Sequence, residues 1–347
     1  MKLLVLVLVV ACGSEAGPSE PRSPVAPRVG GRLTVEERRE LAGAIAVADG
    51  VIVRTRKGNL ARYDGQLRLV VDAVMPSPVA AIASSDGAVF AVFDDQQIMR
   101  VDPQTLALTP LTKASGAPRW IGVRGGDVLV FVRADGHSAL DTVRGTTRTT
   151  LPVELGNSAA AEVGKASTFF LDGNSLWFGV DAGEWGGLVG RIDLATNKTK
   201  IFDASDGDPV FGFVRRGRQL LAYGGLIHLG ISNGTISVIG DRVKRLWQAE
   251  SVMDRRNELG APVAQAITRG NQLLALSWRT LYDVSADYKQ WTKLVELPAR
   301  ARSGRPDSVG SYPATVAMID LGDAILFATT QDGLFVWRDG KLAHVAP

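Results

Sequence analysis

The residues best suited to chemistry are a carboxylate and an indole side by side, Glu184 and Trp185. Both lie in the segment Asp181-Ala182-Gly183-Glu184-Trp185-Gly186-Gly187, where glycine lets the backbone turn sharply and project the two side chains together. Such a pair suits a sugar hydroxyl, a cation or a peptide. In the alternative, structural reading, Trp185 caps a central channel and Glu184 binds backbone amides or an arginine. Asp181, Glu184 and Trp185 are candidate ligand-binding residues.

Residue sets typical of catalysis or of metal binding are missing from the sequence. The three histidines, His137, His228 and His344, are far apart and lack the spacing of a zinc site. The sequence contains no nucleophile elbow, phosphate-binding glycine loop or dinucleotide motif. The aspartates of residues 203–208 lack the spacing of calcium ligands. We therefore expect no catalytic residues, no metal and no cofactor.

The charge pattern bears on the partners of the chain. Its 347 residues include 39 Lys and Arg and 36 Asp and Glu, which gives a formal net charge of +3. The two signs are interspersed along the chain rather than gathered into a basic stripe. We therefore expect no nucleic-acid partner.

The N-terminal residues have the pattern of a secretion signal. Lys2 is followed by the apolar run Leu3 to Val10, which is shorter than the roughly 20 residues that span a bilayer. Val9-Val10-Ala11-Cys12 resembles the lipobox of bacterial lipoproteins, in which the cysteine becomes the mature N-terminus and carries acyl chains. Cys12 is the only cysteine, so no intramolecular disulfide can form.

The lipoprotein resemblance implies a signal peptide over residues 1–11, lipidation at Cys12 and membrane attachment through that lipid. It implies a location in the bacterial cell envelope, and Gly13 after the cysteine favours the outer membrane, facing the periplasm. The alternative is a plain secretory signal with an incidental cysteine.

Residues 12–31 are rich in Gly, Pro, Ser and Glu and have few large apolar side chains, which predicts a flexible tether. Thr34-Val35-Glu36-Glu37 is a capping-box pattern, which predicts a short helix over residues 32–42. The remainder, 43–347, is predicted to form one domain.

Short apolar or alternating runs punctuated by glycine turns fill residues 43–347, as expected of β-hairpins. A unit of four such runs recurs seven times, the later copies beginning near Val79, Pro118, Lys165, Pro209, Pro262 and Pro313. Four strands in every 40 to 50 residues predict an all-β fold, a seven-bladed β-propeller of four-stranded antiparallel blades. A β-sandwich or two smaller β-domains are the alternatives. The count of units favours the propeller, and no linker-like stretch divides residues 43–347.

Two repeats carry a family resemblance. Gly173-Asn174-Ser175-Leu176-Trp177-Phe178-Gly179 and Gly322-Asp323-Ala324-Ile325-Leu326-Phe327-Ala328-Thr329 resemble the superfamily of seven-bladed propellers with two-component-regulator-type or quinoprotein-like repeats. The resemblance implies the fold and no particular activity. Since the first and last units each own four strands, we expect the ring to close by apolar packing.

The excess residues collect in four segments that all belong to one face of a propeller: 154–164, 181–187, 247–261 and 299–312. Long loops on one face of a rigid scaffold are a usual place for a binding site, although they can also be tolerated insertions. Arg119 and Trp120, at the mouth of the third unit, are further candidate ligand-binding residues on that side.

Two functions remain open. In the first, the chain is a lipid-anchored, non-catalytic binding or scaffold protein that presents its long-loop face to a protein, peptide or glycan. In the alternative, it is an envelope polysaccharide lyase or hydrolase that uses Glu184 as general acid or base, for which the sequence offers no second catalytic group.

Overall fold

The structure, a computed structural model, describes residues 31–153, 166–202, 207–228, 231–249, 261–298 and 315–346. Within those ranges the side chains of Glu184, Ile227, His228 and Ile231 are outside the description. The described part is almost entirely β-structure. Its helices are α1 (Val35–Arg39) and the short 3-10 turn η1 (Gly183–Trp185).

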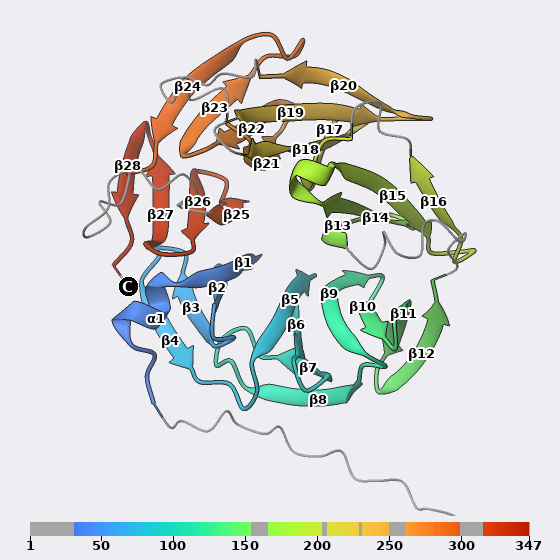
Figure 1. Ribbon diagram of the computed structural model, residues 1–347. Helices are drawn as coiled ribbons and strands as arrows, with labels where there is room; N and C mark the ends of the chain where they lie inside the picture. Colours follow the sequence, from blue (N-terminus) through green and yellow to red (C-terminus); the bar gives the residue numbers. More distant parts are fainter. Residues whose placement is uncertain are drawn as a thin grey trace, which may run out of the picture.

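Seven four-stranded antiparallel sheets stand around a central opening like the blades of a propeller (Figure 1). Each sheet uses four consecutive strands, ordered from the centre outward. Blade 1 is β1 (Leu41–Val47), β2 (Gly50–Thr55), β3 (Leu60–Asp64), β4 (Leu69–Ala73); blade 2 is β5 (Val79–Ser85), β6 (Ala88–Phe93), β7 (Gln97–Val101), β8 (Leu108–Lys113); blade 3 is β9 (Ala117–Arg124), β10 (Asp127–Ala134), β11 (His137–Arg144), β12 (Thr147–Pro152). Blade 4 is β13 (Ala166–Asp172), β14 (Ser175–Asp181), β15 (Gly187–Asp193), β16 (Thr199–Phe202); blade 5 is β17 (Val210–Arg216), β18 (Gln219–His228), β19 (Ile231–Ile239), β20 (Val243–Gln248). Blade 6 is β21 (Val263–Arg269), β22 (Gln272–Ser277), β23 (Thr280–Val284), β24 (Trp291–Glu296), and blade 7 is β25 (Thr315–Asp320), β26 (Ala324–Thr329), β27 (Gly333–Arg338), β28 (Lys341–His344).

The predicted fold is confirmed, and the inner strands of blades 2 to 7 begin within two residues of the six predicted repeat starts. The reason lies in the alternation along each strand. Side chains of successive residues point to opposite faces of a blade, so each blade can pack against both of its neighbours. Seven apolar clusters result, one in each seam between adjacent blades.

Ring closure follows the same principle. The cluster in the seam between blades 1 and 7 joins Val53 and Tyr63 to Leu326 and Leu334. Because both blades own all their strands, the ring closes by apolar packing without strand exchange, as expected. Leu33, which precedes blade 1, is only 2 % exposed and belongs to this cluster.

Helix α1 covers the seam between blades 7 and 1 on the side of the β2–β3 and β26–β27 turns. The capping box is present, with the backbone N–H of Glu37 donating to Thr34 Oγ1 and that of Thr34 to the Glu37 carboxylate. Arg38 pairs with the nearly buried carboxylate of Asp72 at 2.7 Å. The helix is shorter than the predicted 32–42, because Leu41 is fully buried as the first residue of β1.

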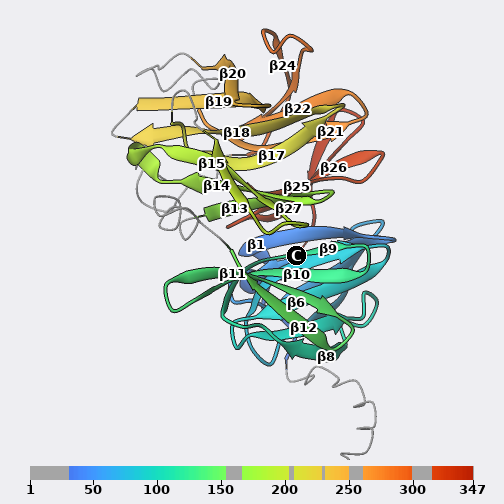
Figure 2. The same cartoon turned by 90° about the vertical axis from the view of Figure 1, so that its right-hand side faces the viewer.

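The two faces of the ring differ in their connections. We call the side formed by the second-to-third-strand turns and the blade-to-blade connections the long-loop face. The hairpin of β18 and β19, the longest strands, with ten and nine residues, projects from it on the left of Figure 2. Of the long segments predicted here, 154–164, most of 247–261 and 299–312 lie outside the described residues.

Candidate functional site

A β-bulge recurs at the start of all seven inner strands. In each blade one residue of the inner strand is skipped in the pairing with the second strand. A bulge leaves one residue unpaired and redirects the strand locally. Since the inner strands begin at the long-loop face, these bulges rim the central opening there (Figure 1). The bulged residues are Ala42, Ala80, Arg119, Ser167, Phe211, Ala264 and Val316.

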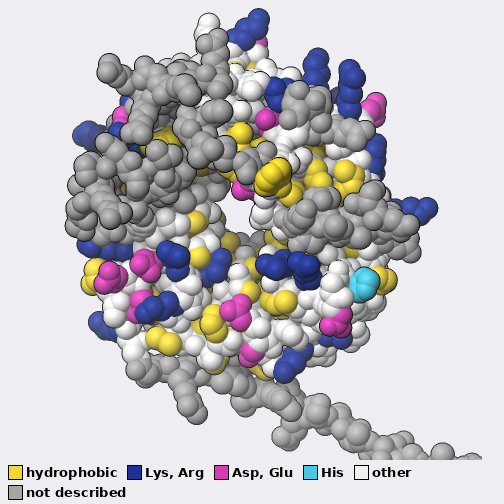
Figure 3. All heavy atoms as spheres, in the orientation of Figure 1, with side chains coloured by type: hydrophobic (Ala, Val, Ile, Leu, Met, Phe, Trp, Pro, Cys, Tyr) yellow, Lys and Arg dark blue, Asp and Glu magenta, His cyan; other side chains and the backbone are white. Residues whose placement is uncertain are grey.

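Arg119 is the only charged residue of this bulge ring. It is exposed, and among the described residues it has no hydrogen-bond or ion-pair partner. Lys and Arg side chains gather at the lower rim of the central opening, over β1 and β9 (Figure 3). The bulge explains how a residue in the middle of a paired strand can reach solvent.

Trp120, the neighbour of Arg119, has a different environment. It is half-buried in the seam between blades 3 and 4, with its ring 5.9 Å from that of Phe169. The indole also lies over Gly122, where a methyl group would overlap the ring. The structure therefore places Trp120 in interblade packing and Arg119 at the surface.

The Trp185 turn, residues 182–186, joins β14 to β15 on the long-loop face. Trp185 is 85 % exposed, more than any other large hydrophobic residue of the described chain. The turn is closed by hydrogen bonds from the backbone N–H of Ala182 to Gly186 O at 2.9 Å and from Trp185 N–H to Ala182 O at 3.2 Å. An aromatic side chain exposed on an internally bonded turn is suited to binding a partner.

Asp181 stands at the base of this turn and is exposed. Its Oδ1 accepts a hydrogen bond from the backbone N–H of Gly183 at 2.9 Å, and its own backbone N–H donates to Oγ of Ser167 at 3.3 Å. Asp181 thus orders the turn and connects it to the bulge ring. The side chain of Glu184 lies outside the described residues, so the predicted carboxylate and indole pair stays a prediction.

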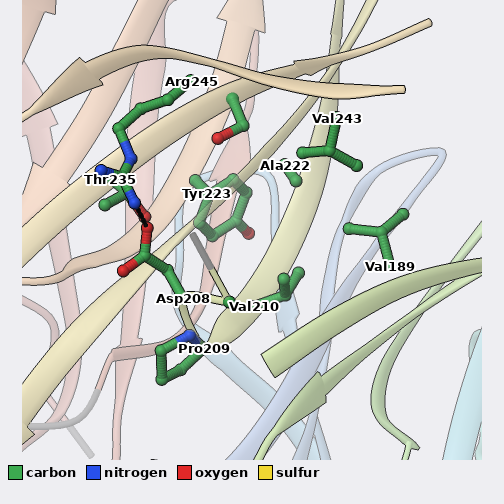
Figure 4. A pocket seen from close by; sticks show the side chains of 11 residues that line it. Val189, Asp208, Pro209, Val210, Ala222, Tyr223, Thr235, Val243 and Arg245 are labelled. Atoms are coloured by element: carbon green, nitrogen blue, oxygen red, sulfur yellow. Dashed lines mark hydrogen bonds and ion pairs between the residues drawn. The ribbon is translucent and has the colours of Figure 1, made fainter. Parts of the chain in front are cut away.

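Blade 5 holds the Trp185 turn from the other side. The backbone N–H of Gly187 donates to Gly207 O at 2.5 Å, and a methyl group at Gly186 would overlap that oxygen. Gly186 also has a φ of 91°, which favours glycine. The adjacent Asp208 forms an ion pair with Arg245 of β20 (Figure 4). The turn is therefore built by blade 4 and fixed by blade 5.

The cavity in Figure 4 is lined in part by both members of this ion pair. Its volume is about 20 Å³, enough for one water molecule and too small for a larger ligand. Tyr223 lines it, and burial raises the pKa of the Tyr223 phenol to about 12, although a hydrogen bond from the Ala266 backbone opposes the shift. The cavity therefore offers no site for a ligand larger than a water molecule.

Trp278 is a candidate that the sequence patterns did not indicate. It occupies the two-residue turn between β22 and β23 on the long-loop face, is 36 % exposed and has a φ of 59°. A bulky residue in this left-handed region is strained, and strained residues often lie at functional sites. The available signal was the lack of glycine in the turn Ser277-Trp278-Arg279-Thr280.

The remaining candidate chemistry is dispersed. His137 is the exposed first residue of β11 in blade 3, and a ring nitrogen of His344 lies 2.7 Å from Asp332 O in blade 7. Within the described ranges, no group of three or more His, Cys, Asp or Glu side chains could hold a metal ion. In the same ranges no helix has the length and apolar character to cross a membrane. Cys12 and the predicted signal peptide and tether up to residue 30 lie outside them.

No protein-family model and no curated protein sequence matches the chain. Solved structures do match it in fold. YCF48 bound to D1 peptide is 9 % identical, with a TM-score of 0.60 over 91 % of this chain and 97 % of that one. BamB from Moraxella catarrhalis is 11 % identical, with a TM-score of 0.51 over 91 % and 99 %. The β-propeller domain of Cps50 (Swd1) from Myceliophteria thermophila is 10 % identical, with a TM-score of 0.59 over 86 % and 97 %. At these identities the similarity establishes the β-propeller fold alone.

Proposed function

We propose that this protein is a non-catalytic binding or scaffold protein, held at the bacterial cell envelope by a lipid on Cys12, that engages a partner through its long-loop face. The observation that carries the proposal is the Trp185 turn. The turn is fixed by its own hydrogen bonds and leaves its indole 85 % exposed, which offers a partner a large amphipathic side chain at a defined position.

The attachment of the turn supports the same conclusion. Hydrogen bonds within the turn, the Asp181 carboxylate and the contact with Gly207 fix the backbone before any partner arrives. A preorganised anchor loses little conformational entropy on binding, so more of its contact energy contributes to affinity. The fold neighbour YCF48 was solved with a bound peptide, which supports a peptide-binding role for a propeller.

The test is an affinity capture from the producing cell's envelope with the full chain and its Trp185→Ala variant. Val70→Ala is the matched control, because Val70 is 50 % exposed at the start of β4, away from the long-loop face. A partner retained by the wild type and the control but lost with Trp185→Ala supports the proposal. Equal capture by all three proteins contradicts a role for the Trp185 turn.

The lipid anchor is tested separately by fractionation of Cys12→Ser. Release of this variant from the membrane fraction supports attachment through the lipid. If it stays bound after a high-salt wash without detergent, lipidation at Cys12 is not what holds the protein there.

A further inference from the structure

The bulge ring presents one residue from each blade at the mouth of the central channel. None of the seven is buried. Six carry no charge, and five of those six are apolar: Ala42, Ala80, Phe211, Ala264 and Val316. Three of the apolar members, Ala80, Phe211 and Val316, also pack against the interblade clusters. The ring itself is mostly apolar and Arg119 is its only charged member, while other Lys and Arg side chains lie near it at the same rim (Figure 3).

That cation, Arg119, is not needed by the described part of the fold. The other interblade arginines are engaged: Arg54 donates to two backbone carbonyls, Arg216 to three, and Arg269 pairs with Asp320. Arg119 has no such partner among the described residues. A guanidinium stays charged at any physiological pH and matches the two oxygens of a carboxylate.

We propose that the channel mouth binds a peptide segment whose acidic side chain pairs with Arg119, while apolar residues beside it contact the uncharged part of the bulge ring. This inference rests on the proposed binding function and names the chemistry of its partner. The planar fork of one guanidinium matches one carboxylate, and no other residue of the bulge ring is charged, so the ring itself favours a peptide carboxylate.

Ser167 connects this site to the Trp185 turn. It is the bulged residue of blade 4, the next blade to Arg119, and its hydroxyl accepts the backbone N–H of Asp181 at the base of the turn. A peptide held at the bulge ring of blades 3 and 4 therefore lies beside the turn that carries Trp185. The bulge ring and the Trp185 turn thus form one continuous surface, on which Arg119 recognises a charge and Trp185 offers an apolar contact.

The experiment uses the full chain and two peptides, fluorescein-Ala-Leu-Glu-Phe-Ala-amide and its Gln counterpart, which carry the dye on the N-terminal amine. Fluorescence anisotropy is the readout. A hydrogen bond between charged groups leads us to expect about ten-fold tighter binding of the Glu peptide to the wild type. Arg119→Gln reduces that ratio to about one, and Arg119→Lys retains part of it because the charge remains but the planar fork is lost.

Arg124→Gln is the matched control, since Arg124 lies at the opposite end of β9 and donates to Asn174 at 3.1 Å. It is expected to keep the full preference for Glu. Equal binding of both peptides, a preference that survives Arg119→Gln, or no binding at about 1 mM peptide each overturns the inference. In those cases a Trp185-dependent partner from the envelope would still leave the proposed function standing. Circular dichroism of each variant verifies that the ring is folded.

Discussion

The clearest energetic prediction concerns Leu33, which lies outside the blades but is only 2 % exposed in the seam between blades 1 and 7. Because no strand is exchanged there, the segment that carries Leu33 and α1 is expected to contribute to closing the ring. Leu33→Ala removes most of a buried side chain and leaves a cavity, and such changes cost about 2–5 kcal/mol. We expect about 3 kcal/mol, measured as the loss in the free energy of unfolding in urea.

Val35→Ala is the control for this prediction, since Val35 belongs to the same segment but is 47 % exposed. Its expected cost is about 0.5 kcal/mol or less, as for other exposed sites. A second variant, Arg38→Met, leaves the Asp72 carboxylate without its ion pair and should also destabilise strongly. If Leu33→Ala costs no more than Val35→Ala, the segment is an appendage and does not help to close the ring.

Three further predictions follow from contacts within the blades. Burial raises the pKa of Tyr223 to about 12, against about 10 in an unfolded chain, so the folded state holds the phenol proton more tightly and stability falls as pH rises from about 10 to about 12. Tyr223→Phe should flatten that decline in the free energy of unfolding measured by urea titration. An unchanged slope refutes the assignment. Hydrogen bonds from the backbone and side chain of Thr196 lower the pKa of Asp193. The stabilising effect of the Asp193 carboxylate is therefore present above about pH 4 and is lost as pH falls through its folded-state pKa. Asp193→Asn should weaken this loss of stability in acid, and a stability profile identical to that of the wild type refutes the prediction. Arg245→Gln removes the ion pair of Asp208 and should broaden the ¹⁹F NMR signal of 5-fluorotryptophan at Trp185. Arg269→Gln, in the seam between blades 6 and 7, is the control and should leave that signal sharp. A sharp signal in both variants shows that the ion pair does not position the turn.

The repeat architecture was predictable from the sequence because its signals are local. Glycine turns and alternating apolar runs recur in each unit, so the inner strands of blades 2 to 7 could be located within two residues. The helix boundary was less accurate, because a capping box marks a start and not an end. Burial of Leu41 in the seam between blades 1 and 7 ends the helix early, and that is a tertiary effect.

The site was only partly predictable. The sequence drew attention to Trp185 because glycines surround it, and the structure places this indole in solvent. The sequence could not separate Arg119 from Trp120. Trp120 pairs with Phe131 of β10 and packs on Phe169, whereas the bulge leaves Arg119 unpaired and exposed. The bulges have no common residue type, so no sequence pattern reveals the ring that they form.

The claim that a partner binds the long-loop face at Trp185 is tested most directly by photo-crosslinking in the producing cell. A photoreactive p-benzoylphenylalanine replaces Trp185 in one variant and Val70, at the start of β4, in the other. The account predicts a discrete crosslinked partner from position 185 and none from position 70. A partner crosslinked from position 70 alone, or from neither position, would contradict it.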